Sequence, residues 1–473
     1  MLLLNNYPSI IEYFSPYFES CFDTSRDYKQ FKRAITGLLL SDNKTLEAIN
    51  RSLLIDQIDQ SNFNRFFHRI VPKLSLVNEK RLALLQSKRG TAIKSSGPIR
   101  GVLSIDNSLL KHYGKHFEHI SYQRDYVHGG FRWCHDLVSL YYSDDQTDYP
   151  IDFKLWQPAN WSAVIDFYRE QGVSINEAKV ALKETDPRAY RIYANSLNKR
   201  KASKFPAIKS IYKTKIDLAE DLVLQFKAKY PDTKLPIVLD SGFASGTFCE
   251  KLYKKYGFDY IGAKRLDTSF EDEQGQKVKF QTLVDQLRKQ LKDDPKVLTK
   301  IAYSYRGKKS YRYTYTFKAH VSQFKRKQKI VISFTKVDAT DRPLVLVSNR
   351  FNWNPSGILR MWRHRWPVET YHQEGKAVGL ESYQVRNWGA IHSYIQFIAV
   401  AYSMLKAVPH HPILLEKLQR DFPLKIKNNT LPFLRRLMKA ESIMFLILNA
   451  FNAIEQGQDF KQWFEPLLSV IAY

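Results

Sequence analysis

The segment from residue 101 to 157 constrains the fold most strongly, because it predicts three strands in succession before any long helix. An apolar strand covers Gly101–Ser108, and two further strands cover 130–142 and 149–157. Strands that follow one another in this way favour antiparallel pairing in a meander. We therefore expect a sheet that begins with three antiparallel strands.

Two predicted strands lead into an aspartate. Asp106 lies near the end of the first strand, and Asp240 directly follows another apolar strand over 235–239. Gly242 permits a tight turn after Asp240, before a predicted helix over 245–256. An aspartate at the end of a strand is often only a cap or a turn residue, so a structural role stays open for both.

A third carboxylate lies in the stretch 360–376. Pro367 is suited to the first position of a new helix, and Glu369 then falls in the first turn, where the helix dipole favours a carboxylate. Arg365 precedes the helix and can point to the same place. Helical spacing predicts four polar residues on one face: Glu369, His372, Gln373 and Lys376. A site that holds a metal ion and grips phosphates needs such a set, although a solvated helix face has the same pattern.

The charge of the chain narrows its partners. Its 473 residues suffice for two or three domains, and 73 Lys and Arg against 47 Asp and Glu give a net charge of +26. This excess implies a polyanionic partner, with nucleic acid as the first candidate and a membrane surface as the alternative. The start, Met1–Tyr7, lacks the features of a signal peptide. Polar residues interrupt the apolar stretch 391–408, which we interpret as a buried core helix.

The cysteines indicate neither a disulfide framework nor a metal centre. Cys21, Cys134 and Cys249 lie far apart, which fits a reducing cytosol. Cys134 and His135 directly precede Asp136 in the second strand, but no second pair of ligands completes a metal motif. We therefore do not count Asp136 among the site residues.

The spacing Trp362-x2-Arg365-x3-Glu369-x6-Lys376 resembles the Y-x2-R-x3-E-x6-K signature of cut-and-paste bacterial insertion-sequence transposases, with Trp362 in place of the usual Tyr. These are DDE enzymes with an RNase H-like catalytic core. Asp106 at its strand end and the D-x-G-F run that begins at Asp240 are similar to the two aspartate motifs of that family. The resemblance covers roughly residues 100–405.

The resemblance implies a catalytic triad of Asp106, Asp240 and Glu369. The three carboxylates are then expected to hold Mg²⁺ or Mn²⁺, two ions in all, for cleavage at transposon ends and attack of the freed 3′-hydroxyl on target DNA. Arg365 and Lys376 are expected to hold DNA phosphates near the scissile bond. The DNA-binding residues expected in this region are Arg365, Lys376, Trp362 and His372.

The implied fold class is α/β (α+β): an RNase H-like mixed-sheet core interrupted by a β-rich insertion, with helical regions at both ends. The expected divisions follow in chain order: a helical N-terminal DNA-binding region (1–88), a basic linker (89–100), the first part of the core (101–264), the insertion (265–342), the second part of the core (343–408) and a helical C-terminal region (409–473).

Two of these regions carry further expected DNA contacts. Helices over 45–53 and 61–70 resemble a helix-turn-helix. Ser61 is expected as the N-cap of the second helix, which would present Arg65 and Arg69 to a groove of the DNA. A purely structural bundle explains these helices equally well. In the insertion, ten Lys or Arg and no Asp or Glu occur over 300–330, where a hairpin and strands are predicted. The insertion residues expected to contact DNA are Lys308, Lys309 and Arg312, with a solvated sheet face as the alternative.

The expected function is a transposase that binds the ends of its mobile element, cuts them and joins them to a target. Its expected partners are double-stranded DNA, both terminal inverted repeats and target, and a second copy of itself, with no membrane. A cytoplasmic location at the prokaryotic nucleoid follows from this. The alternatives are a catalytically silent protein that only binds the transposon ends, and a metal-dependent nuclease that cuts without joining.

Overall fold

The computed structural model describes residues 4–54, 58–95, 99–422 and 430–471. Three of the expected divisions fall partly outside these ranges. The residues concerned are 1–3 and 55–57 of the N-terminal region, 96–98 of the basic linker, and 423–429 and 472–473 of the C-terminal region.

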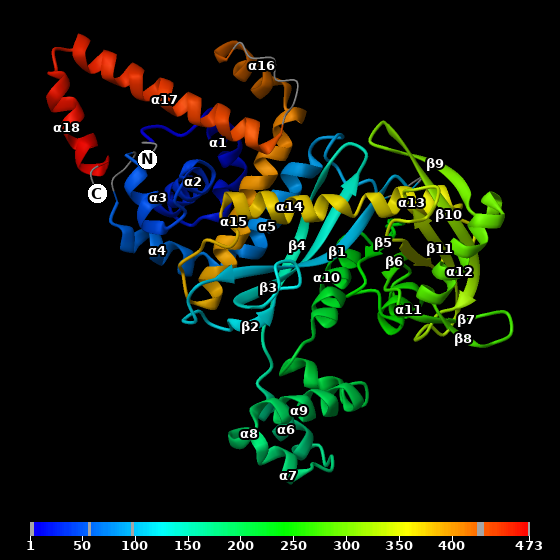
Figure 1. Cartoon of the computed structure of the whole chain (residues 1–473). Coiled ribbons are helices and arrows are strands. Elements are labelled where there is room, and N and C mark those ends of the chain that lie inside the picture. Colours follow the sequence, from blue (N-terminus) through cyan, green and yellow to red (C-terminus); the bar gives the residue numbers. More distant parts are fainter. Residues whose placement is uncertain (1–3, 55–57, 96–98, 423–429, 472–473) are drawn as a thin grey trace.

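A mixed sheet, with ten strands in the described residues, forms the centre of the molecule (Figure 1). It opens with β1 (Gly101–His112), β2 (Ser121–Arg124), β3 (Phe131–Asp144) and β4 (Asp148–Trp156). β3 pairs antiparallel with β1 on one side and with β4 and the short β2 on the other. The expected antiparallel meander is therefore confirmed, and β2 is an addition that the sequence did not predict.

The sheet continues with parallel strands. β5 (Ile237–Leu239) pairs parallel with β1, and β6 (Tyr260–Lys264) pairs parallel with β5. The helix α10 (Lys215–Lys229), which leads into β5, packs on β3 and β4, and α11 (Gly246–Lys254) connects β5 to β6. This combination of antiparallel and parallel strands with helical connections confirms the predicted α/β (α+β) class.

The insertion extends the same sheet. β12 (Leu344–Ser348) is antiparallel both to β6 and to β11 (Lys327–Phe334), and β10 (Lys308–His320) and β9 (Thr299–Tyr305) follow outward. β12 is apolar and mostly buried, as expected for a strand paired on both edges. The remaining insertion elements are β7 (Ser269–Glu271), β8 (Lys277–Lys279), α12 (Phe280–Asp293) and η4 (Pro295–Val297).

The N-terminal helices surround α15 (Trp388–Ala407), which is buried on nearly all sides. This confirms the core helix expected over 391–408. The surrounding elements are α1 (Ser9–Phe14), η1 (Ser15–Cys21), α2 (Ser25–Leu40), α3 (Leu46–Ser52), α4 (Gln60–Arg69), η2 (Val71–Lys73) and α5 (Leu74–Gln86). In α5 the buried guanidinium of Arg81 donates to the carbonyls of Pro150 and Ile151 in β4, which ties these helices to the sheet.

The N-cap of α4 is Asp59, not Ser61 as expected, because the Asp59 carboxylate accepts the backbone N–H of Ser61. The connection from α3 to α4 spans residues 53–59, longer than the turn of three to four residues that characterises a helix-turn-helix. The apolar side of α4 packs on α15 and leaves its polar side exposed.

A small helical module hangs below the sheet in Figure 1, between β4 and α10. It consists of α6 (Trp161–Glu170), α7 (Glu177–Val180), α8 (Leu182–Thr185), α9 (Pro187–Lys201) and η3 (Pro206–Ser210). Its buried residues, among them Tyr168 and Leu197, form a hydrophobic cluster separate from the main core. A module with its own core was not predicted at this place from the sequence.

The C-terminal elements are η5 (Val408–His410), α16 (Pro412–Asp421), α17 (Leu431–Glu455) and α18 (Phe460–Ile471). α17 extends away from the body (Figure 1). By length and composition it could cross a membrane, and 22% of its most apolar stretch is buried. One such helix is weak evidence for a membrane span.

Candidate active site

The sheet brings the two aspartates together. In the parallel pair of β1 and β5, Ile105 lies opposite Leu239. Asp106 and Asp240 are the next residues of these two chains, so they follow the paired positions side by side. Neighbouring strands lie about 4.8 Å apart, and parallel strands end at the same sheet edge. Two residues far apart in the chain therefore lie side by side.

A tight turn orients Asp240. Its Oδ1 accepts the backbone N–H groups of Gly242 and Phe243, each at 3.0 Å. The turn then leads through the N-cap Ser245 into α11. The carboxylate of Asp240 is thus fixed by the backbone that follows it.

Glu369 reaches the site from a pair of nearly continuous helices, α13 (Pro355–Arg363) and α14 (Trp366–Val378). α14 begins at Trp366, one residue earlier than expected, and Pro367 takes its second position. The reason is that the chain keeps helical geometry between the two helices: Arg365 has φ −73° and ψ −32°, and its N–H donates to the carbonyl of Trp362 at 3.0 Å.

Arg365 joins the acid of α14 to the acid of β1. Its Nη2 forms an ion pair with Oε1 of Glu369, and its Nη1 lies 3.4 Å from Oδ2 of Asp106. The guanidinium also lies 5.0 Å from the ring centroid of Trp362. The stretch 360–376 and the first strand therefore meet, as the sequence predicted.

The carboxyl group of Asp106 has a raised pKa. Burial raises the pKa of its carboxyl to about 7; Arg365 opposes this shift, and the neighbouring acids Asp240 and Glu369 add to it. A cation placed among these three carboxylates stabilises their ionised forms.

The donor set suits a hard divalent cation, because carboxylate oxygens are the ligands that Mg²⁺ and Mn²⁺ prefer. In the described ranges no three His, Cys, Asp or Glu residues lie close enough to hold a metal ion. The guanidinium of Arg365 lies between Asp106 and Glu369 and marks the place where positive charge is stabilised. The carboxylates are therefore of the chemical type that a divalent ion prefers, and such an ion would take the place of the guanidinium.

Two predicted DNA-binding residues of α14 point toward the protein. His372 is 6% exposed, and its Nε2 lies 3.3 Å from Oγ of Ser139, the residue opposite Asp106 in the sheet. Burial lowers the pKa of His372 to about 3. Lys376 donates to the carbonyl of Leu109 at 2.9 Å and pairs with Glu381 at 3.0 Å. In this arrangement both side chains hold α14 on the sheet.

The basic residues predicted in the insertion lie in two places. Lys308 and Lys309 are exposed at the start of β10. Arg312, four residues beyond Lys308 in β10, lines a small cavity together with Trp362 and Arg365. In the N-terminal region Arg65 is exposed on α4, and Arg69 pairs with Asp27.

Sequence reasoning missed the groups that hold the helix junction in place. His364 is fully buried, and its Nε2 lies 3.3 Å from Oδ1 of Asp145 in the β3–β4 turn. Arg360 pairs with the same carboxylate. The histidine lies within the stretch 360–376, but only the fold shows that a turn more than 200 residues earlier receives it.

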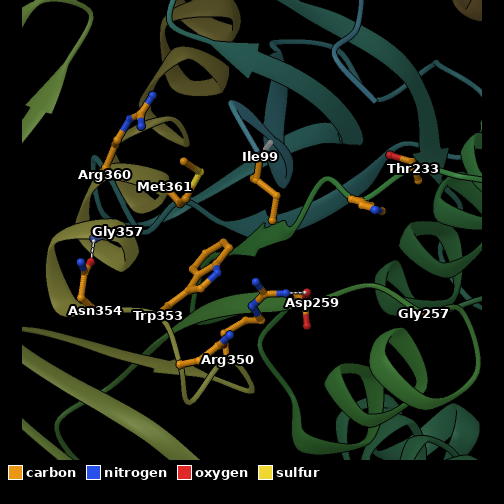
Figure 2. Close-up of a pocket in the computed structure, with 12 residues that line it drawn as sticks. Ile99, Thr233, Gly257, Asp259, Arg350, Trp353, Asn354, Gly357, Arg360 and Met361 are labelled. Atoms are coloured by element: carbon orange, nitrogen blue, oxygen red, sulfur yellow. Dashed lines mark hydrogen bonds and ion pairs between the residues drawn. The ribbon is translucent and has the colours of Figure 1, made fainter. Parts of the chain in front are cut away.

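A cavity of about 630 Å³ lies elsewhere on the sheet (Figure 2). Figure 2 shows Arg350 paired with Asp259, beside Trp353. Asp259 precedes β6, whereas Asp240 follows the parallel strand β5. The cavity and the acids therefore lie at opposite ends of these strands. The cavity is therefore not part of the carboxylate site.

A search of curated proteins found no match to the chain. A profile of the DDE superfamily endonucleases matches residues 17–315, which include Asp106 and Asp240 and end before Glu369. Endonucleases of this superfamily typically depend on a divalent metal ion. Since the match covers more than half of a chain whose sheet places two aspartates side by side, the protein belongs to the DDE superfamily endonucleases.

Proposed function

We propose that the chain is a transposase of the Y-x2-R-x3-E-x6-K group, which cuts DNA at the ends of its mobile element and joins the freed 3′ ends to a target. One observation carries this proposal. Arg365 joins the carboxylates of Asp106 in β1 and Glu369 in α14, and Asp240 follows the strand that pairs with β1 beside Asp106. Membership of the DDE superfamily endonucleases supports the cutting step.

In the proposed mechanism Asp106, Asp240 and Glu369 hold Mg²⁺ or Mn²⁺. When bound, the metal supplies Lewis acidity that activates a water or a 3′-hydroxyl and stabilises the leaving oxygen. The protein itself positions the acids: β1 fixes Asp106, and the turn after β5 fixes Asp240. Arg365 has five N–H donors and donates two of them to the carboxylates of Asp106 and Glu369. The remaining donors can bind a phosphate of the scissile strand.

We also propose that DNA lies along the basic insertion. The net charge of +26 and the exposed Lys308 and Lys309 support this, since they provide positive charge beside the sheet that carries the acids. Arg312, further along β10, lines a small cavity together with Arg365. The exposed face of α4 with Arg65 is a further proposed contact. The proposal implies that the protein is cytoplasmic and binds DNA at the nucleoid.

A homodimer belongs to the proposal, because two ends must be joined. α17 supports it by exposing a stripe of apolar side chains at helical spacing, with Ile443, Ile447, Phe451 and Ile454 between 47% and 61% exposed. Analytical ultracentrifugation of the wild type and of Phe451→Glu tests this contact. We expect a dimer in the wild type that dissociates in the variant, and a monomeric wild type on its own DNA would contradict it.

The test of function uses terminal DNA from the flanks of the gene. Purified protein is incubated with this DNA in Mg²⁺ or Ca²⁺, and cleavage and joining products are separated on one gel. Asp106→Asn, Asp240→Asn and Glu369→Gln should each abolish cleavage in Mg²⁺ while end binding in Ca²⁺ persists. The matched control is Asp232→Asn, an exposed acid shortly before β5, which should cut normally.

The alternatives give other outcomes. Binding without any cut, in wild type and variants alike, identifies a silent protein that only occupies the ends. Cleavage without joined products identifies a nuclease. Full cleavage by any one acid variant shows that this residue was assigned wrongly.

A further inference from the structure

The hairpin of β2 and β3 exposes an unusual set of aromatic side chains. Tyr122 is 59% exposed, Tyr126 84% and Phe131 53%, and Val127 in the same turn is 85% exposed. Large apolar side chains gathered on a surface mark a binding site more often than they serve stability.

The strand register gathers these side chains on one face. Tyr122 lies opposite Trp133, and Arg124 lies opposite Phe131. The rings of Tyr122 and Phe131 are stacked, with centroids 5.6 Å apart and planes at 22°. We call the face formed by Tyr122, Arg124, Phe131 and Trp133, with Tyr126 at its tip, the aromatic ribbon.

The tip of the ribbon is held in one shape. Asp125 is buried, and its Oδ1 accepts the backbone N–H groups of Val127 at 3.0 Å and His128 at 3.2 Å. Its Oδ2 pairs with Lys111 at 2.7 Å. The exposed rings therefore sit on a preorganised turn, so a ligand that binds them orders little new backbone.

The surroundings of the ribbon favour an anion. The two acids nearby are engaged: Asp125 with Lys111, and Glu118 with the backbone N–H of Trp388 at 2.6 Å. Within the described residues, Arg124, which shares the face of the ribbon, has no carboxylate within ion-pair distance. Arg124 instead lies over the ring of Tyr126, 5.3 Å from its centroid.

The ribbon lies on the face of the sheet that carries the first acid. Ser139 is opposite Asp106, and Trp133 and Phe131 follow Ser139 on the same side of β3 at intervals of two residues. Eight residues of strand separate Phe131 from Ser139, about 26 Å at 3.3 Å per residue. The ribbon therefore lies within about one turn of the double helix from the first acid, beyond the side chains of His372 and Tyr383 that cover the face between them.

We propose that the aromatic ribbon binds unpaired bases of the DNA strand that leaves the carboxylate site, by stacking them on Tyr122 and Phe131. This rests on the proposed function, because it takes its ligand from a DNA molecule held for cutting. Exposed rings accept the faces of bases, and duplex DNA hides those faces in its own stack. Arg124, which lies on the same face as these rings, contacts a phosphate of the same strand. A protein partner would use the apolar rings equally but has no need of this unpaired cation.

The test compares two probes of arbitrary sequence, a short blunt duplex and the same duplex with an unpaired 3′ arm. Affinities are measured in Ca²⁺, so that no cleavage is required. For Tyr122→Ala/Phe131→Ala we expect the Kd for the armed probe to rise about tenfold or more, as loss of base stacking predicts. The Kd for the blunt duplex should stay unchanged. 2-Aminopurine in the arm should be quenched by the wild type and by Tyr122→Phe, and not by the double variant.

The matched control is Ile192→Ala, an apolar side chain 62% exposed on the helical module, which should bind both probes like the wild type. An unchanged Kd of the double variant for the armed probe overturns the proposal. An equal loss on both probes also overturns it, because the ribbon would then contact duplex. Cleavage is not measured, so a protein that fails to cut its ends can still confirm the ribbon, and one that cuts can still refute it.

Discussion

Arg365 takes the place of a cation in the carboxylate site. It contacts both Asp106 and Glu369, and its own side chain is 14% exposed. The buried Asp106 has few other sources of stabilisation, since its remaining hydrogen bond comes from the backbone N–H of Asn107. Arg365 therefore holds Asp106 and Glu369 together.

We expect Arg365→Ala to lower the free energy of unfolding by about 1–3 kcal/mol, because a buried carboxylate loses its charged partner. Addition of Ca²⁺ should restore part of this loss if the acids bind a divalent ion. Urea unfolding with and without Ca²⁺ measures both effects. Arg363→Ala, an exposed neighbour, serves as the control. A variant as stable as the wild type without Ca²⁺ would show that Arg365 does not stabilise the acids.

The sequence located the acids better than it located their neighbours. Asp106, Asp240 and Arg365 were predictable because strand ends and motif spacing are local properties of the chain. The orientation of His372 was not, since helical spacing gives the angle between side chains but not which face meets the sheet. The partner of His364 was not predictable either, because Asp145 lies in a distant turn.

At the scale of elements, the insertion hairpin is clamped to the core. Arg306, in the turn between β9 and β10, pairs with the buried Asp148 at 2.8 Å and donates to the carbonyl of Asp144. Burial raises the pKa of Asp148, but Lys406 and Arg306 outweigh this and hold it at about 2. The hairpin with Lys308 thus cannot move without exposing or breaking this pair.

Arg306→Ala should lower the free energy of unfolding by roughly 2–3 kcal/mol, since Asp148 stays buried and, among the described residues, keeps Lys406 as its one charged partner. Lys309→Ala in the same hairpin should leave stability unchanged, because its side chain is exposed. Thermal and urea unfolding of the two variants provide the comparison. Equal stabilities would mean that the hairpin is not anchored by this pair.

The helix pair α13–α14 makes stability depend on pH. Burial lowers the pKa of His364 to about 4 and that of His372 to about 3, below the ordinary value of 6.5. Between these values each of the two histidines binds more protons in the unfolded chain than in the folded protein, so their contribution to stability is full above pH 6.5 and falls as the pH decreases. Each such histidine contributes up to about 1.4 kcal/mol per pH unit.

Urea unfolding at a series of pH values from 7 to 5 tests this dependence, before most carboxylates titrate. His372→Gln should flatten the profile, although it also lowers stability at pH 7 by leaving an imperfect fit. His116→Gln, an exposed ring, should leave the profile of the wild type unchanged. A profile of His372→Gln as steep as that of the wild type would contradict the assignment.

Several elements could be predicted because their patterns are local. The strands β1, β3 and β4 were found from the sequence pattern, and α15 from its length and composition. The continuity of the insertion with the core sheet was not predictable, since it depends on which strand β12 pairs with on each edge. The separate core of the helical module was missed for the same reason: amphipathic spacing does not show which helices meet.

At the scale of the whole molecule, the helical module is an appended unit. The chain leaves the sheet at the end of β4 and returns at α10, and the rings of Trp156 and Tyr212 meet at this neck, 6.5 Å apart. Salt bridges of Lys209 with Asp217 and of Lys213 with Asp221 hold the base of the module on α10.

Replacement of residues 160–212 by a short Gly-Ser linker should leave the remaining protein folded, because the module shares no core with the sheet. Circular dichroism should show the loss of helix, and thermal unfolding should keep a cooperative transition within a few degrees of the wild type. An aggregated or molten product would show that the sheet needs the module.

The neck has a consequence for how this protein can change over generations. For the folding of the sheet, the chain between Trp156 and Tyr212 acts as one long loop. The free-energy cost of closing a loop rises by only about 0.6 kcal/mol with each doubling of its length. Insertions, deletions or a wholly different sequence at this point therefore scarcely affect folding of the enzyme. Natural selection can remodel what the module touches while the carboxylate site, and the sheet that builds it, stay the same.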